Sequence, residues 1–544
     1  MGDRCFCIFE GGGAKGIAHV GALAALEDSD LEPCGFAGTS AGAVIAALAA
    51  AGYRSSDLVS STGTILDLVD LDRSNIWGHA PHKPAGRPGK LFGPIGWFGI
   101  RIARNGGAYV LTLLVTGILL APALLVHWRA VPYDGLPYAV LTSFAAVIML
   151  GCLLSNGLAS LSTFEWGLNQ LLRLKLAARL DPSTAHQARR PEPITFADLS
   201  RAGCPPLRVV AADITTRQLR LFSNATTPDT SVAKAVSASV CLPVIFRPRR
   251  IDGHLHLDGG LVSNLPAWAF DAERALDRDA WTAVVQVGEE VETQRLWGLR
   301  ILTAAVLTGI FGSGLLNVRN VDRLKAVRLN VELRLLEFDP GLETAFRVVE
   351  EAKVATLEKL VYHLQQVPTL MNEVCERIQT RARRTFNLAL RTENRPEFVG
   401  RIRVSVFVRP RDDSASLTAE FQAGFTDAPD ERIRVPIQDS IVGQALQSGE
   451  PLYLERGDPN WSAYLSRPQH RWLRKLVWPD ISWVLCVPYI NTADGMELVV
   501  AIDSDTSLEV RTELVDVTMA SLSDEVMTML RSYVPKEAFI DGST

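Results

Sequence analysis

One pattern occurs twice within the first 52 residues and constrains the fold more than any other feature. A short apolar run (CFCIF, 5–9) leads into GGGAKG at 11–16, and PCGFAG (33–38) leads into GTSAG at 38–42. A helix rich in small residues follows each glycine turn. Short apolar runs are typical of buried strands, and strands that alternate with helices form parallel sheets. The pattern therefore predicts an α/β fold built on a parallel sheet.

Composition limits the class of protein. The 544 residues exceed one ordinary core, so two or three domains are expected. Charged residues make up 21% and the net charge is −5, which excludes a disordered chain and offers no general attraction for nucleic acid. The eight cysteines show no metal-ligand spacing, so we predict reduced thiols in a cytosolic compartment and no metal site. No secretory signal peptide is expected, because an apolar strand and the glycine loop follow Arg4 at once.

Two uncharged runs interrupt the first domain. Residues 107–128 and 137–161 contain no Asp, Glu, Lys or Arg. As helices, both are long enough to cross a hydrocarbon core of about 30 Å. Only the short segment 129–136 joins them, so the sequence predicts an inserted transmembrane hairpin over 107–161. A pair of buried core helices is the alternative.

The charges around the hairpin predict its orientation. Basic residues flank it on both sides, whereas the link carries only Arg129. Positively charged flanks stay in the cytoplasm, so the catalytic and C-terminal parts are expected there, with two membrane spans. A third apolar run, 301–316, is shorter and indicates a buried or amphipathic helix, with an interfacial segment as the alternative.

The glycine loop admits two interpretations. GGGAKG fits G-x-G-x-x-G, which also marks dinucleotide-binding folds. Those folds place an acidic residue at the end of the next strand, about twenty positions on, to bind the ribose. This chain has PCGFAGTSAG there instead. The sequence therefore predicts no nucleotide cofactor.

GTSAG fits the G-x-S-x-G pattern of a nucleophile elbow. Small residues at Gly38 and Gly42 permit the strained strand-to-helix turn that exposes the hydroxyl of Ser40. The N–H groups of Gly12 and Gly13 are then placed to stabilise an oxyanion formed by attack on an ester. The alternative is a small-residue turn that only permits close helix packing.

A serine nucleophile needs a base. The segment HLHLDGGLVSNLP (254–266) places Asp258 on a turn after a strand, and Gly259 and Gly260 leave its carboxylate uncrowded. We predict that Asp258 is this base. A Ser-His-Asp triad using a nearby histidine is the alternative, with His19, His254 and His256 as candidates.

These three motifs, in this order, resemble the patatin-like phospholipase family, which combines GGGx[RK]G, GxSxG and DG[GA]. The resemblance covers about residues 5–365, less the hairpin, which departs from the usual family domain. It implies a Ser-Asp dyad of Ser40 and Asp258 without histidine. It further implies an oxyanion hole formed by a glycine loop, with residues Gly11, Gly12, Gly13, Lys15 and Gly16. The elbow glycines are Gly38 and Gly42, and the turn glycines are Gly259 and Gly260.

The sequence predicts that the C-terminal part of the chain forms a separate domain. A helical linker is expected at 366–395. Residues 396–535 resemble a GAF domain through GQALQSGEPLYL (443–454), VLCVPYI (484–490) and LVVAIDS (498–504). The resemblance implies an α+β sensory or dimerisation domain that binds a small-molecule effector or pairs with a second copy.

Together these features predict a patatin-like parallel-sheet hydrolase domain over 1–365 with a GAF-like domain after it. The expected function is that of a membrane-anchored serine acyl hydrolase. It would cleave phospholipid or lysophospholipid acyl esters without metal or cofactor, and the C-terminal domain would regulate it. The alternative is a catalytically dead, membrane-tethered ligand sensor on the same scaffold. Labelling with a fluorophosphonate probe distinguishes the two.

Overall fold

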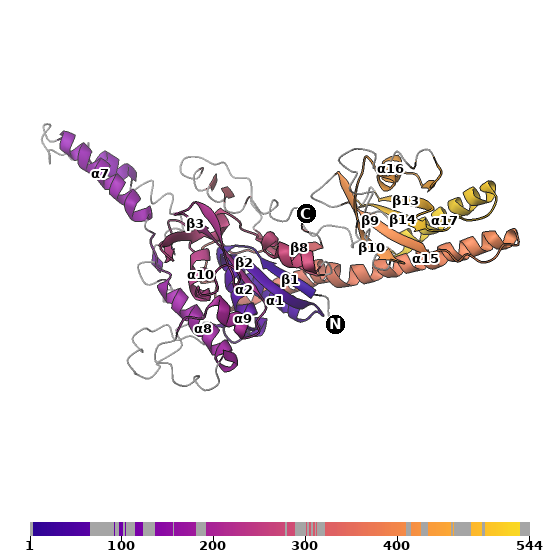
Figure 1. Ribbon diagram of the computed structural model, residues 1–544. Helices are drawn as coiled ribbons and strands as arrows, with labels where there is room; N and C mark the ends of the chain where they lie inside the picture. The colour runs from indigo at the N-terminus through magenta and orange to yellow at the C-terminus, as the bar shows by residue number, and fades with distance from the viewer. Residues whose placement is uncertain are drawn as a thin grey trace. The chain divides into compact units, whose positions relative to one another are not determined.

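The protein is described from a computed structural model. It describes residues 4–65, 136–155, 157–180, 192–277, 280–288, 323–409, 415–425, 433–458, 480–491 and 496–533, with isolated residues at 92–124, 301–321 and 461. The chain divides into two compact units, 1–361 and 362–544 (Figure 1). Each unit has its own sheet.

The first unit is built on an eight-stranded sheet with the order β5-β6-β3-β2-β1-β7-β8, and β4 also pairs with β3. The central strands run parallel, as predicted: β1 (Arg4–Phe9), β2 (Glu32–Thr39), β3 (Leu207–Asp213), β7 (Trp281–Gly288) and β8 (Leu324–Asn330). Three strands differ from the prediction because they pair antiparallel with a neighbour: β4 (Gln218–Phe222) and β6 (His254–Asp258) with β3, and β5 (Arg249–Ile251) with β6. Short turns join β3 to β4 and β5 to β6 and return the chain antiparallel, whereas a long connection that contains α10 joins β4 to β5.

Helices rich in small residues pack closely on this sheet. The glycine loop enters a 3₁₀ turn (Gly13–Ile17) and then α1 (Ala18–Glu27), and Ser40 leads directly into α2 (Ala41–Ala50). Nine of the ten residues of α1 are buried. Other helices of the unit are α3 (Ser55–Leu58), α8 (Ser162–Leu180), α9 (Phe196–Arg201), α10 (Val232–Ser239), α11 (Asp271–Leu276) and α14 (Leu342–Thr356).

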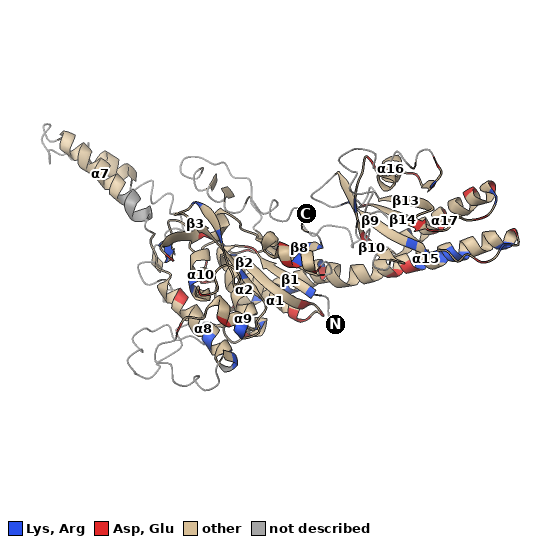
Figure 2. Ribbon diagram, in the orientation of Figure 1, with Lys and Arg blue, Asp and Glu red and all other residues tan. Residues whose placement is uncertain are grey.

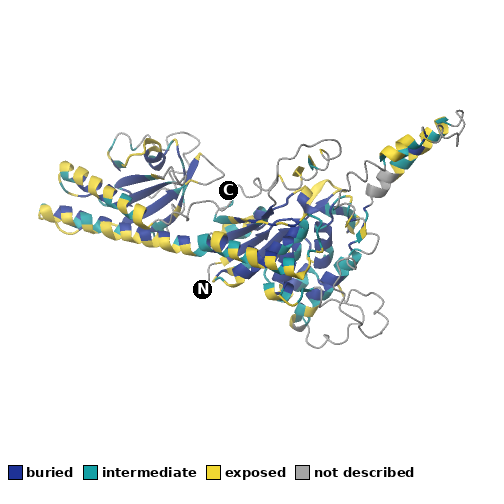
Figure 3. Ribbon diagram, turned by 180° about the vertical axis from the view of Figure 1, so that it is seen from behind, coloured by how far each residue is buried: buried dark blue, intermediate teal, exposed yellow. Residues whose placement is uncertain are grey.

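The predicted hairpin is described only in part. Most of 107–128 and of the third run, 301–316, lies outside the described residues. Helix α7 (Leu136–Ser155) covers most of the second predicted span, 137–161, and carries no charged residue (Figure 2). Several large apolar side chains along it are exposed (Figure 3). Within the described parts of the chain, no helix meets the length and apolarity required to cross a membrane, so the predicted transmembrane hairpin lacks this support.

The second unit is a six-stranded antiparallel sheet with the order β11-β10-β9-β14-β13-β12. The strands are β9 (Ile402–Val408), β10 (Ser416–Ala423), β11 (Arg434–Pro436), β12 (Leu452–Glu455), β13 (Trp483–Asn491) and β14 (Met496–Ser504). Alternate residues face opposite sides of the sheet. Val404 and Val406 pack in the core with α15 (Val367–Thr392) and α17 (Thr512–Tyr533), whereas Phe407 packs with α16 (Ile441–Ser448).

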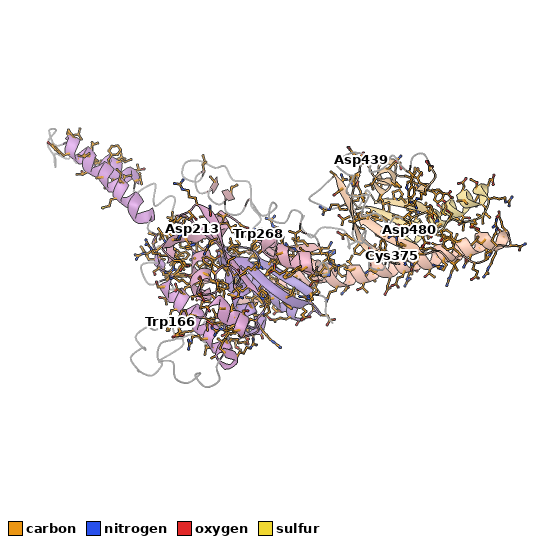
Figure 4. The ribbon with its side chains drawn as sticks, viewed as in Figure 1. Trp166, Asp213, Trp268, Cys375, Asp439 and Asp480 are labelled. Atoms are coloured by element: carbon orange, nitrogen blue, oxygen red, sulfur yellow. The ribbon has the colours of Figure 1, made fainter. Side chains whose placement is uncertain are left out.

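The segment predicted as a linker, 366–395, belongs instead to the core of this second unit. Helix α15 spans most of it and buries Met371, Cys375 (labelled in Figure 4) and Phe386. A π-helical segment (Leu357–Gln366) precedes α15, and Pro368 lies in the first turn of α15. Proline is tolerated in a first turn, where its missing N–H has no intrahelical partner to lose.

Candidate active site

Ser40 lies on a strained turn between β2 and α2. Its backbone has φ 51° and ψ −123°, a region that residues with a side chain seldom adopt. The turn is tight: a Cβ on Gly42 would lie 2.2 Å from the carbonyl oxygen of Phe9, and one on Gly38 would lie 2.4 Å from Gly42. A strained serine at a strand-to-helix turn is typical of a nucleophile elbow. The G-x-S-x-G glycines are therefore required by close backbone approach.

The strand register brings Asp258 to this elbow. Thr39, the last residue of β2, pairs with Val210, and the next residue of β3, Ala211, pairs with Asp258 at the end of β6. The Ser40 hydroxyl donates to Oδ2 of Asp258 at 2.7 Å. The N–H of Gly260 donates to Oδ1 at 2.8 Å. Two residues 218 positions apart thus form a direct serine–carboxylate pair.

Burial sets the proton affinity of this carboxyl. Asp258 is 1% exposed, and burial raises its pKa to about 7, against the lowering effect of the Gly260 N–H and the Ser40 hydroxyl. Desolvation disfavours the charged form of an acid. A base with a pKa near 7 is suited to take and return a proton near neutral pH.

The side chain of Ser239 and the carbonyl of Cys241 hold the main chain of Ser40 and Asp258 in place. The sequence motifs did not identify either residue as part of the site. Ser239, the last residue of α10, accepts the N–H of Ser40 at 2.8 Å and donates to the carbonyl of Val210 at 2.6 Å. The carbonyl of Cys241 accepts the N–H of Asp258 at 2.8 Å. The end of α10 therefore fixes the backbone of both Ser40 and Asp258. The only signal in the sequence was the SASVC stretch that precedes β5.

Two N–H groups of the glycine loop have no acceptor among the residues that the structure describes. Gly11 N–H donates to the carbonyl of Asn264 at 3.0 Å, and Ala14 N–H donates to Leu335 at 2.9 Å. Within the described residues, the N–H groups of Gly12 and Gly13 have no such partner. Free N–H groups beside a nucleophile can stabilise an oxyanion.

Close packing restricts the other glycines of the predicted loop and turn. Lys15 is buried, and Gly16 approaches Ala41 so closely that a Cβ there would lie 2.4 Å from the alanine methyl. Gly259 is equally restricted, because a Cβ would lie 2.2 Å from the carbonyl oxygen of Val210. Each of these contacts brings backbone of the elbow, the loop or the turn closer than a side chain would permit.

The three histidines lie elsewhere in the hydrogen-bond network. His254 pairs through Nδ1 with Asp213 (labelled in Figure 4) at 2.8 Å. His256 Nδ1 lies 3.2 Å from the carbonyl of His254, and His19 Nε2 donates to the carbonyl of Glu10 at 2.8 Å. Among the described residues, no histidine is hydrogen bonded to Ser40 or Asp258. This geometry favours the dyad interpretation over the triad.

The loop after Asp258 is tied to β2 and carries a residue that motif analysis did not single out as part of the site. Thr39 Oγ1 donates to the carbonyl of Ser263 at 2.8 Å, and the indole of Trp268 (Figure 4) donates to Ser263 Oγ at 3.0 Å. Asn264 follows and contacts both Gly11 and Glu10. No group of three or more His, Cys, Asp or Glu side chains suited to a metal ion occurs in the described part of the chain.

Both parts of the chain are similar to known proteins. Residues 7–271 match the family described as patatin-like phospholipase. The uncharacterised Bacillus subtilis protein YqhO is 24% identical over 361 residues, which cover 64% of this chain and 93% of YqhO. The structure of VipD from Legionella pneumophila aligns with a TM-score of 0.31 and 18% identity, over 70% of this chain and 77% of VipD. A GAF domain of a phosphoenolpyruvate-protein phosphotransferase from Coxiella burnetii aligns with a TM-score of 0.19 and 14% identity, over 30% of this chain and 95% of that domain.

Proposed function

The N-terminal unit belongs to the patatin-like phospholipase family and is a lipid acyl hydrolase, and we propose that it cleaves phospholipid or lysophospholipid acyl esters through a Ser40–Asp258 dyad. The observation that carries the proposal is the 2.7 Å hydrogen bond from the Ser40 hydroxyl to Asp258 Oδ2. It joins a strained elbow to a buried carboxylate that has the pKa of a base active near neutrality.

The geometry supports the following sequence. Ser40 Oγ attacks the ester carbonyl carbon while its proton passes to Oδ2 of Asp258. The N–H groups of Gly12 and Gly13 stabilise the oxyanion. Asp258 then gives the proton to the leaving alcohol oxygen, and an acyl-serine forms. Water attacks this ester, its proton passes to Asp258 and then to Ser40, and the fatty acid leaves.

Hydrolysis of vesicles and of lysophospholipid micelles tests the proposal. Ser40→Ala and Asp258→Asn are each expected to lower kcat by several orders of magnitude. The control variant His254→Ala is expected to retain activity, because His254 bonds to Asp213 and not to the dyad. A wild-type protein that releases no fatty acid would contradict the proposal and favour the inactive-sensor alternative. Loss of activity only in His254→Ala or His256→Ala would replace the dyad by a triad.

We also propose that residues 107–161 attach the protein to a membrane, with both units on the cytoplasmic side. Support comes from the two uncharged runs and from the exposed apolar side chains of α7 (Figures 2 and 3), which include Leu141, Phe144 and Ile148. An apolar surface of this kind favours contact with lipid. Replacing 107–161 by a short flexible linker should release the protein from membranes and preserve hydrolysis of a soluble short-chain ester. A folded deletion variant that still sediments with membranes would contradict the proposed anchor.

We further propose that residues 396–535 form a GAF-like domain that regulates the hydrolase in response to a small molecule or a second copy of the chain. Support comes from the antiparallel sheet covered by helices on both faces. The expected result is that a chain ending at Leu364 hydrolyses vesicles at a different rate from the full chain, at matched concentrations and with cell extract as a source of effector. Equal rates under all conditions would remove the regulatory role.

A further inference from the structure

Two buried polar side chains of the first unit lie next to the glycine loop and form no hydrogen bond with Ser40 or Asp258. Asn264 is 1% exposed and Glu10 is 6% exposed. Asn264 Nδ2 donates to the carbonyl oxygen of Gly11 at 3.1 Å and to Glu10 Oε1 at 3.2 Å. Glu10 Oε2 accepts the N–H of Val287 at 3.0 Å. Buried groups of this kind are costly unless paired, so their placement requires an explanation.

The bond to Gly11 determines where the next N–H points. In a trans peptide, the carbonyl of one residue and the N–H of the next point in opposite directions within one plane. The Gly11 carbonyl is held by Asn264, so the Gly12 N–H of the same peptide points away from Asn264. That N–H has no acceptor among the described residues. The asparagine thus selects one of the two orientations that a glycine peptide would otherwise exchange.

Glu10 determines the orientation of the asparagine amide. An amide has one donor end and one acceptor end, and the donor end must face Glu10 Oε1 and the Gly11 carbonyl, which are both acceptors. The opposite orientation would place three oxygen atoms against one another. Oδ1 of Asn264 is left buried without a hydrogen-bond partner, next to Gly11. The amide keeps its donors on the Gly11 carbonyl and on Glu10, although this orientation leaves its own oxygen without a hydrogen bond.

Main-chain hydrogen bonds also hold the start of the glycine loop. Gly11 N–H donates to the Asn264 carbonyl at 3.0 Å, so residue 264 holds Gly11 from both its N–H and its C=O. Glu10 N–H donates to Val285 at 3.0 Å, and the Glu10 carbonyl accepts from His19. The start of the loop therefore has little freedom, and its direction depends on the side chain of Asn264.

We propose that Asn264, oriented by Glu10, is a positioning residue that aims the Gly12 N–H at the oxyanion formed when Ser40 attacks an ester. The proposal rests on the function proposed above and adds two residues that act through the loop. Neither Asn264 nor Glu10 transfers a proton in the reaction.

The first experiment compares Asn264→Ala with a matched control, Asn169→Ala. Asn169 is also buried in the first unit, and Asn169→Ala loses the hydrogen bond from the N–H of Ile194 to Oδ1 at 2.9 Å, whereas Asn264→Ala loses two hydrogen bonds. With a soluble short-chain ester, Asn264→Ala should lower kcat about 100-fold, the effect of losing one oxyanion donor, and change KM less than about threefold. The control, Asn169→Ala, should lower the melting temperature but leave kcat within about threefold of the wild-type value. Equal kcat in the two variants would overturn the proposal.

A second experiment separates positioning from folding by exchanging donor and acceptor. In Asn264→Asp two carboxylates face each other, so this single variant should melt below wild type. Glu10→Gln is measured as the reference, since it loses one hydrogen-bond acceptor but also removes a buried carboxyl whose pKa burial raises to about 7. In the double variant, the introduced glutamine can donate to the introduced aspartate and still accept from Val287. The assay is run at pH 8, above the pKa of about 7 to which burial raises the carboxyls of Glu10 and Asp258, so the introduced aspartate is expected to be ionised and unable to donate to the Gly11 carbonyl.

The double variant should therefore regain much of the lost melting temperature while kcat stays about 100-fold below wild type. Recovery of kcat together with melting temperature would show that the pair only supports the fold, and would overturn the proposal. The wild-type enzyme is assayed in parallel. If it fails to hydrolyse the ester, the proposed function fails; if it is active and the folded variants match it, only the positioning role fails.

Discussion

Replacing Asp258 with asparagine should make the first unit more stable while abolishing its activity. Asparagine has the same shape and can keep both hydrogen bonds: its oxygen accepts from Gly260, and its amide donates to the Ser40 oxygen. What it removes is a buried carboxylate that must be ionised to act as a base. Such an exchange of stability for activity is common at active sites.

The magnitude follows from the pKa of Asp258, which burial raises to about 7, from about 3.9 in an unfolded chain. Below about pH 4, Asp258 is protonated in both the native and the unfolded state, so its burial does not lower the free energy of unfolding. Between pH 4 and 7 the unfolded chain ionises first, so the native state loses stability as pH rises. Above pH 7 the cost levels off at about 4 kcal/mol, since each pKa unit corresponds to about 1.4 kcal/mol. At pH 5 it is about 1 to 2 kcal/mol.

Thermal unfolding of the first unit, followed by calorimetry at pH 5 and pH 8, measures this difference. An unfolding entropy of about 2.1 cal/mol/K per residue, applied to the 361 residues of the unit, converts the two costs into melting increases of about 2 °C and about 5 °C. The control is Asp213→Asn, because burial of Asp213 is outweighed by hydrogen bonds from Thr216, His254 and Thr215, which hold its pKa at about 2. That variant should melt lower than wild type at both pH values. An Asp258→Asn protein no more stable at pH 8 than at pH 5, relative to wild type, would refute the reasoning.

Three further predictions concern separate parts of the molecule. The rate of ester hydrolysis should rise with pH through about 7, because only the ionised form of Asp258 accepts the proton of Ser40, and a pH–rate profile with an acidic limb near pH 4 would contradict this. Gly42→Ala should remove most folded protein in a solubility and circular dichroism assay, since its Cβ would lie 2.2 Å from the Phe9 carbonyl oxygen; a folded, active variant would show that the elbow can relax. In the second unit, Arg403 and Asp503 form a buried ion pair at 2.7 Å, so Arg403→Ala should lower the unfolding free energy by about 3 to 5 kcal/mol in denaturant titration, and a loss under about 1 kcal/mol would contradict it.

Local patterns in the sequence were sufficient to predict the elements around the nucleophile. The apolar runs correspond to β1 and β2, and the glycine turns lead into α1 and α2. These elements are adjacent in sequence, and each depends on short-range requirements such as the glycines beside Ser40. The direct pairing of Ser40 with Asp258 also agrees with the motif order, although their contact spans 218 positions.

Long-range features could not be read from the sequence for physical reasons. The antiparallel direction of β6 depends on pairing with β3, about 45 residues earlier, and no local pattern encodes that choice. Ser239 and Asn264 act through one or two hydrogen bonds to backbone groups, and a small polar residue gives no periodic signal. Helix α15 resembled a linker because its charged face dominates the sequence, whereas its other face is buried in the second unit.

Mapping the covalent adduct of a fluorophosphonate probe tests the central claim most directly. The probe reacts with an activated serine, and the protein should carry one adduct, on the peptide that contains Ser40, when examined by mass spectrometry. Ser40→Ala should carry none, and Asp258→Asn should react several orders of magnitude more slowly at pH 8 while remaining folded. A folded wild-type protein that forms no adduct at Ser40, or that reacts at the same rate without the Asp258 carboxylate, would contradict the Ser40–Asp258 hydrolase.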